Sequence, residues 1–361
     1  MRRGGFKPKK LMAVAMCLLF AGIGLVFLAD SRAAFFSSGV DGGQDGVADI
    51  RGATSGNRLL VPYSMGLAPY AYVPYGNVTM AAYADATGAK NFFAAFILGS
   101  GCTPAWDGEN TLKLSSSRGA AIATDIASVR AKGGDVAVSF GGESGTELAN
   151  SCTDARKLQG AYQSVITKYS LKHINLDLEY EGESDAAAMA RRVEAIKALQ
   201  VANPGLKVSL TVPVETTGLT PAALNTVQKF HDGGVVVSSI GVMAMIFGPS
   251  AERQSDRVVA AVQGTVSQLK KIYPGISTEE AHKAVNIIVL PGYNSDGEIF
   301  TTIDATAVKD FATQNGIGTL SFWSANRDKP CGMGASISEG TCSGTAQSAN
   351  QFGQLMAMPA M

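Results

Sequence analysis

The chain has 361 residues, of which 46% are hydrophobic, and it carries 30 basic and 30 acidic side chains. This apolar content suffices for a large core, and the balanced charge lacks the basic surplus typical of nucleic-acid-binding proteins. We therefore expect a globular protein without a nucleic-acid partner.

The start of the chain has the features of an export segment. Lysine and arginine residues are concentrated in the first ten positions and precede an uncharged stretch over residues 11–28. With small residues at its end, the segment 1–33 fits a cleavable signal peptide. The uncharged stretch is also long enough to span a bilayer as an uncleaved signal anchor, the one membrane contact we expect. Both interpretations predict that the remainder is exported, either secreted or tethered outside the cytoplasm.

Residues 34–58 are rich in Gly, Ser and Asp and show little apolar periodicity, which predicts a flexible spacer. The remaining residues, 59–361, have the length of one large α/β domain. We expect this domain to be a monomer.

Within that domain, apolar strand-like segments alternate with amphipathic helical segments. Strands are predicted at 67–73, 91–98, 135–141, 173–180, 207–214, 239–247, 285–291 and 319–324. Helices are predicted at 118–132, 153–169, 185–202, 221–231, 256–273 and 305–315. Eight strands separated by helices indicate parallel pairing, and no Gly-rich phosphate loop follows the first strand. The pattern therefore favours an α/β fold closed into a (β/α)8 TIM barrel over an open doubly wound sheet.

Four cysteines follow the leader, which itself contains Cys17. They are Cys102, Cys152, Cys331 and Cys342. An even number in an exported protein indicates disulfides, for which three pairings are possible. We favour Cys102–Cys152, which would join the loops after the second and third strands, and Cys331–Cys342, which closes a short loop. A zinc site is the rival interpretation, but no CxxC spacing or histidine partner supports it.

The fourth predicted strand reads HINLDLEY over residues 173–180. Because alternate residues of a strand share a face, Asn175, Asp177 and Glu179 point to one side and the leucines to the other. Two neighbouring carboxylates do not easily ionise together, so one should keep a proton near neutral pH, as a general acid requires. Glu179 is the better candidate, because it is nearer the carboxyl end of the strand, where the active sites of such barrels lie.

These residues carry a resemblance to a known family. The fourth strand resembles the DxxDxDxE signature of family 18 glycoside hydrolases, and the segment 139–142 resembles the SxGG motif of that family. Trp323 stands where the family has a tryptophan on the eighth strand. The chain is most similar to the bacterial and archaeal chitinase subgroup, which has a Phe-Gly-Gly turn and a Trp-Ser-x-Asn-Arg-Asp segment, here at 323–328.

The resemblance implies hydrolysis of chitin or N-acetylglucosamine oligosaccharides by a substrate-assisted retaining mechanism, without a metal or other cofactor. Glu179 would protonate the glycosidic oxygen, and Asp177 would orient the sugar's own acetamido group as it attacks. The substrate-binding residues that we expect are Trp323, Asn175, Ser139, Gly141, Gly142, Met245 and Tyr293.

The sequence departs from the family pattern at Lys172 and His173 and, with more consequence for catalysis, at two further positions. Asn175 replaces an Asp that can share a proton with Asp177, and an amide cannot carry that charge. Ile246 replaces a further Asp at the sixth strand, so a hydrogen-bonding wall becomes apolar. A slow or specialised enzyme is one interpretation, and a lectin-like barrel that binds chitooligosaccharides with little turnover is the alternative. Cleavage of N-glycans between two N-acetylglucosamines is a related activity.

Overall fold

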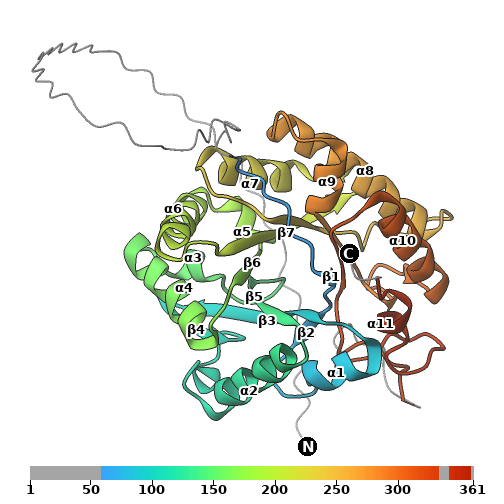
Figure 1. Ribbon diagram of the computed structural model, residues 1–361, viewed down its shortest axis with the longest axis horizontal. Helices are drawn as coiled ribbons and strands as arrows, with labels where there is room; N and C mark the ends of the chain where they lie inside the picture. Colours follow the sequence, from blue (N-terminus) through green and yellow to red (C-terminus); the bar gives the residue numbers. More distant parts are fainter. Residues whose placement is uncertain (1–57, 333–340, 359–361) are drawn as a thin grey trace, which may run out of the picture. The chain divides into compact units, whose positions relative to one another are not determined.

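The computed structural model describes residues 58–332 and 341–358, and these form a curled, mainly parallel sheet surrounded by helices (Figure 1). The predicted (β/α)8 architecture is confirmed. Its parallel strands are β1 (Gly66–Leu67), β2 (Tyr70–Tyr72), β3 (Asn91–Ser100), β5 (Asp135–Gly141), β6 (His173–Asp177), β7 (Lys207–Glu215), β9 (Ser239–Met243), β10 (Val285–Val289) and β13 (Thr319–Phe322).

The first predicted strand is divided in two, and this division closes the barrel. β1 pairs with the last strand, with Gly66 opposite Thr319, whereas β2 pairs with the next strand, with Tyr70 opposite Phe93. The sheet order is β1-β13-β10-β9-β7-β6-β5-β3-β2, so one short segment reaches both edges of the sheet. Closure aligns the carboxyl ends of the strands at one mouth.

Helices lie outside the ring of strands (Figure 1). The long helices are α1 (Met80–Thr87), α2 (Ser117–Ala131), α4 (Ala155–Tyr169), α6 (Ala186–Ala202), α7 (Pro221–Asp232), α8 (Gln254–Ile272) and α10 (Thr302–Asn315). Local signals set their ends: the Asp154 side chain accepts from the backbone N–H of Lys157 at the start of α4, and Gly316 ends α10 in a left-handed conformation.

Short elements lie between these strands and helices. They are the helices α3 (Leu148–Ser151), α5 (Glu181–Ser184), α9 (Thr278–Ala284) and α11 (Gln351–Leu355), the 3-10 turn η1 (Asn110–Leu112), and the strands β4 (Thr103–Trp106), β8 (Gly218–Leu219), β11 (Gly292–Tyr293) and β12 (Ile299–Phe300). The strand pattern did not predict these elements, because each is too short to show a period.

The core lies mainly between the sheet and the helices. Ile174 and Leu176 of β6, and Leu178 just after it, are fully buried there, as their alternation with polar residues predicts. A smaller cluster inside the barrel includes Tyr70 and Phe93, whose rings stack with centroids 4.9 Å apart. The barrel interior is therefore a packed layer beneath the mouth and not a pore.

Both favoured disulfides are present. Cys102–Cys152 links the turn between β3 and β4 to the end of α3, and Cys331–Cys342 closes a local loop. The predicted export segment 1–33 and the spacer 34–58 lie outside the described residues, apart from Arg58. Within the described ranges, no helix has the length and apolar character needed to cross a bilayer.

Candidate active site

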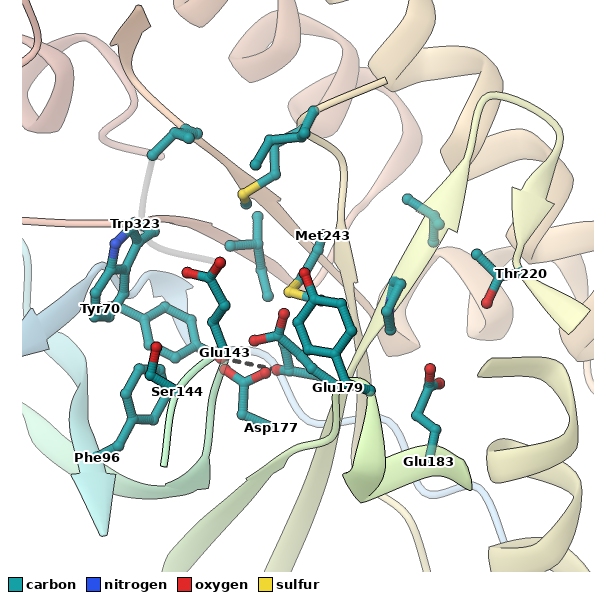
Figure 2. Close-up of a pocket in the computed structure, with 18 of the residues that line it drawn as sticks. Tyr70, Phe96, Glu143, Ser144, Asp177, Glu179, Glu183, Thr220, Met243 and Trp323 are labelled. Carbon is teal, nitrogen blue, oxygen red and sulfur yellow. Dashed lines mark hydrogen bonds between the residues drawn. The ribbon is translucent and has the colours of Figure 1, made fainter. Parts of the chain in front are cut away.

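A cavity of about 650 Å3 opens at the carboxyl ends of the barrel strands (Figure 2). This volume is in the range of pockets that bury most of a small ligand. The residues that line it are Tyr70, Tyr72, Phe96, Asp107, Glu143, Ser144, Asp177, Glu179, Tyr180, Glu183, Thr211, Pro213, Val214, Thr220, Ala222, Met243, Met245, Ile246, Ile288, Leu290 and Trp323.

Asp177 is the last residue of β6 and is only 4% exposed. Its Oδ1 atom is buried and has no hydrogen-bond partner among the described residues. Burial raises the pKa of the Asp177 carboxyl well above its usual value, and the charge of Glu179 raises it further. The carboxyl therefore lies at the cavity wall with an unused hydrogen-bonding atom.

Glu179 lies just beyond the strand, where the chain leaves the barrel. Burial raises the pKa of Glu179 to about 7, and the negative charges of Glu143 and Glu183 contribute in the same direction. A carboxyl with a pKa near neutrality exists in both protonation states at working pH, so it can donate a proton and then accept one. The alternation of the strand predicted this carboxylate pair, and the structure brings both members to the cavity.

Trp323 forms an aromatic surface on one side of the cavity (Figure 2). Its ring stacks on that of Phe96, with centroids 5.2 Å apart and planes at 19°. Tyr70 and Tyr72 meet it edge-on, at 6.1 Å and 5.9 Å. These contacts fix the orientation of the indole, whose flat apolar face suits the face of a sugar ring.

Asn175 lies behind the cavity wall, in a hydrogen-bond network that joins four strands. Its Nδ2 atom donates to the Tyr70 hydroxyl at 3.1 Å and to Ser139 Oγ at 2.8 Å. Its Oδ1 atom accepts from Ser209 Oγ at 2.8 Å and from Thr211 Oγ1 at 3.2 Å. The amide uses its full hydrogen-bonding capacity inside the barrel. Asn175 and Ser139 were expected to touch substrate, but neither is among the cavity-lining residues.

Gly141 and Gly142 lie where neighbouring atoms leave no room for a side chain, and neither residue lines the cavity. Both have positive φ, +100° and +96°, which favours glycine. A Cβ atom on Gly141 would lie 2.0 Å from the carbonyl oxygen of Asp177, and one on Gly142 would lie 2.8 Å from the ring of Phe96. The motif that predicted substrate contact thus sets the position of Asp177 and of the ring that supports Trp323.

The sixth-strand wall is apolar, as expected from its sequence. β9 ends at Met243, earlier than predicted, and Met243, Met245 and Ile246 all line the cavity. Ile246 has φ +57°, which is rare for a β-branched residue, and it is 46% exposed. Arg257 fixes the turn that follows by donating to the carbonyl oxygen of Phe247 at 2.9 Å.

Tyr293, a further predicted contact, lies on β11 and is 39% exposed, but it is not among the cavity-lining residues. Ser144, which the motif places in the loop after β5, does line the cavity. The sequence thus predicted that Tyr293 follows the seventh barrel strand, but not that its side chain lies outside the cavity lining.

Glu183 is a cavity residue that the strand motifs did not predict. It lies on α5, four residues after Glu179, and its Oε1 atom is buried without a hydrogen-bond partner among the described residues. Burial raises the pKa of Glu183 to about 7. Helical spacing could not have identified it from Glu179, because Glu179 precedes the helix and Tyr180, between the two glutamates, has a non-helical φ of +46°.

A buried ion pair supports this turn from below. Arg192 of α6 donates to Glu147 Oε2 at 2.6 Å and to the carbonyl oxygen of Gly182 at 3.0 Å. The backbone N–H of Gly182 in turn donates to the carbonyl oxygen of Glu179 at 2.7 Å. The segment between the two cavity glutamates is therefore fixed to the surrounding helices.

Comparison with known proteins gives consistent relatives, although no protein-family model matches the sequence. A probable bifunctional chitinase/lysozyme of Escherichia coli K12 is 28% identical over 74% of this chain and 32% of its own length. Endochitinase 11 of Metarhizium anisopliae is 27% identical over 73% of this chain and 53% of its own length. The chain thus spans about a third and about half of these two relatives.

Solved structures extend the similarity. The catalytic domain of a hyperthermophilic chitinase from Pyrococcus furiosus is 28% identical with a TM-score of 0.72, covering 83% of this chain and 96% of that domain. Catalytic-site mutants of active domain 2 of the thermostable chitinase from the same organism, complexed with chito-oligosaccharides, give 27% identity, a TM-score of 0.73 and coverage of 84% and 96%. A family GH18 chitinase from Pseudoalteromonas aurantia, 17% identical with a TM-score of 0.52 and coverage of 72% and 93%, shares the fold. The chain is thus similar in sequence and in architecture to chitinases, and it shares the fold of a family 18 glycoside hydrolase.

Proposed function

We propose that this chain hydrolyses β-1,4-linked N-acetylglucosamine chains, in chitin or in chitooligosaccharides. The observation that carries the proposal is the pair formed by the buried Asp177 and the partly buried Glu179, two carboxyls that line one wall of a cavity with an aromatic surface. The names of the relatives and of the solved structures support the same substrate class.

The mechanism that we propose needs no nucleophile from the protein. A sugar ring lies against Trp323, and Glu179 gives its proton to the oxygen of the scissile bond as the bond to the anomeric carbon breaks. The acetamido oxygen of the same sugar attacks that carbon and forms an oxazolinium ion. Glu179, now a carboxylate, removes a proton from water, whose oxygen opens this ion. The configuration at the anomeric carbon is retained.

Asp177 has an electrostatic role in this scheme. Its unpartnered Oδ1 atom is available to accept a hydrogen bond from the acetamido N–H. The carboxylate then stabilises the positive charge that develops on the oxazolinium ring. Asn175, by contrast, is neutral and engaged by four partners, so it gives no second charge to the pair. We therefore propose slower turnover than in relatives with an Asp at this position.

A lectin-like barrel is the second candidate, and one observation favours it. Met243, Met245 and Ile246 give the cavity an apolar wall where the family pattern has a polar one. Binding by stacking on Trp323 and by burial against this wall does not require turnover.

Product analysis separates the two candidates. The full-length chain, purified in mild detergent, is incubated with chitotetraose to chitohexaose and the products are identified by mass spectrometry, with Glu179→Gln alongside. Shorter N-acetylglucosamine oligomers from the native chain only are expected. Saturable binding without products at several pH values would overturn the hydrolase proposal and favour the lectin. A glycoprotein carrying N-glycans, tested in parallel, measures the related cleavage between two N-acetylglucosamines.

We also propose that the barrel acts outside the cytoplasm. The two disulfides and the basic, apolar leader support this location. Cell fractionation with an antibody against the barrel is the test: the medium or the outer membrane face is expected, and a wholly cytoplasmic pool with free thiols would contradict the proposal. A smaller mass in the medium would identify the leader as a cleaved signal peptide.

A further inference from the structure

The charged groups that line the cavity are all acidic. They are Asp107, Glu143, Asp177, Glu179 and Glu183, and no Lys, Arg or His is among the lining residues in the part of the chain that the structure describes. A concave surface with charges of one sign concentrates their field and attracts ligands of the opposite sign. A neutral N-acetylglucosamine chain makes no use of this field.

The presence of four of these carboxyls is explained without a charged ligand. Asp177 and Glu179 belong to the proposed chemistry, Asp107 lies 2.7 Å from the hydroxyl of Tyr75, and Glu143 is on an exposed loop open to solvent. Glu183 differs, because its buried Oε1 atom lacks a partner in the described part of the chain and burial raises the pKa of its carboxyl. A buried polar atom without a partner in the free protein is a group that a ligand can satisfy.

Glu183 also has a defined place relative to the scissile bond. Figure 2 shows Trp323 and Glu183 on opposite sides of Glu179, with Thr220 on the Glu183 side. The sugar on Trp323 is the one whose acetamido group reacts. The ring on the other side of Glu179 belongs to the leaving group, which needs no acetamido group for the reaction. Its amino group can therefore be free without loss of chemistry.

We propose that the leaving-group side of the cavity, built on Glu183, takes a glucosamine ring with a free ammonium group, so that partly deacetylated chitin is the preferred polymer. This inference rests on the proposed function. The ammonium brings three N–H donors and a positive charge to an unpartnered carboxylate, which offsets the cost of its burial. The same field disfavours an anionic glycan such as peptidoglycan, whose stem peptides carry carboxylates.

The test uses the full-length chain and a partly acetylated chitosan with a random acetylation pattern. The products are sequenced by mass spectrometry, and the share of glucosamine at new non-reducing ends is compared with its share in the polymer. We expect enrichment of roughly threefold or more, the effect of one partly screened charge pair. Glu183→Gln should remove the enrichment. Glu181→Gln is the matched control, an exposed glutamate on the same turn that does not line the cavity, and should keep it.

Ionic strength provides a second readout that needs no variant. Because salt screens charge attraction, the enrichment should fall as NaCl rises from about 0.05 M to about 0.5 M. New ends that match the polymer composition, or enrichment that persists in Glu183→Gln or at high salt, would overturn the inference. So would release of muramic acid fragments from peptidoglycan at a rate comparable with chitosan cleavage. If the chain cleaves chitohexaose but the new ends on chitosan show no bias, this inference alone is wrong. If no substrate gives any product, the proposed function is wrong as well.

Discussion

Two regions of the molecule bury carboxyl groups to the same extent and treat them in opposite ways. Glu147, beneath the barrel mouth, is 7% exposed and accepts from Arg192 at 2.6 Å, from the backbone N–H of Ala149 at 2.7 Å and from the Tyr162 hydroxyl at 2.9 Å. Asp177, in the cavity wall, is 4% exposed, and its Oδ1 atom has no partner among the described residues.

The difference shows that burial alone does not identify a functional carboxyl. Taking a carboxylate out of water is costly in both regions. Around Glu147 the protein itself offsets this cost, and the result is a rigid joint between helices. Around Asp177 and Glu183 the cost remains in the free protein, and a ligand can offset it. Unpartnered atoms at a cavity are therefore more informative than burial or charge.

The largest expected effect comes from breaking the paired region. Arg192→Met leaves Glu147 buried without a cation and should lower the free energy of unfolding by about 3–5 kcal/mol. Urea denaturation measures the loss, and adding Glu147→Leu to this variant should recover much of it. Arg191→Met is the matched control, because this partly exposed neighbour donates, within the described residues, to a single group, the carbonyl oxygen of Ala149. A loss for Arg192→Met as small as for the control would contradict the comparison.

The unpaired region should respond in the opposite way. Asp177→Asn removes the charge that stabilises the oxazolinium ion and should lower the hydrolysis rate by roughly 10²–10³. The free energy of unfolding should stay equal or rise, because an unpaired ionisable group has left the interior. Steady-state kinetics on chitohexaose and a denaturation curve are the two measurements. Activity within tenfold of the native chain, or a marked loss of stability, would show that Asp177 has a structural role like that of Glu147.

Glu183 gives a smaller effect that depends on pH. The folded-state pKa is about 7 against an ordinary value of 4.5, so the fold favours the protonated form and loses stability as pH rises from 4.5 through about 7. Glu183→Gln should remove that loss and stabilise the protein by about 1 kcal/mol at pH 8, with no gain below pH 4.5. This figure is discounted for solvent screening because the residue is partly exposed. Melting curves at both pH values test it, and Glu181→Gln should show no such dependence.

The smallest expected effect concerns Glu143. Glu179 must hold a proton to act as an acid, so hydrolysis should fall as pH rises through about 7. Glu143→Gln removes a negative neighbour, lowers the pKa of Glu179 and moves this basic limb to lower pH by a few tenths of a unit, because the loop is exposed and screened. A rate profile against pH measures the shift. Movement to higher pH would show that the sign of this interaction is wrong.

Much of the fold could be predicted from sequence because barrel strands and long helices have strong periodic patterns. β5 begins and ends at the predicted residues, and Pro221 begins α7 as its cap sequence predicts. The division of the first strand was not predicted, although Pro69, which has no backbone N–H to donate to a strand ladder, lies between β1 and β2. The disulfide pairing followed from which loops the topology brings together.

The site was only partly predictable, because alternation assigns a side chain to a face and not to a depth. Asn175 and Asp177 share the inner face of β6, yet the first contacts four barrel side chains and the second reaches the cavity. Ser139 lies at the same inner level, opposite Asn175 in the register. Glu183 was missed because a four-residue helix is too short to produce a periodic pattern.

The backbone at Ile246 has a consequence for redesigning this cavity. At φ +57° an isoleucine occupies a region that Asp, Asn and Gly enter with less strain. Most changes that add a polar group to an enzyme cavity exchange stability for activity. Here Asp would suit the local backbone better than the residue that it replaces and would add a polar group to the apolar wall of the cavity. Position 246 is thus one where a polar side chain can be introduced with less backbone strain than the native residue has.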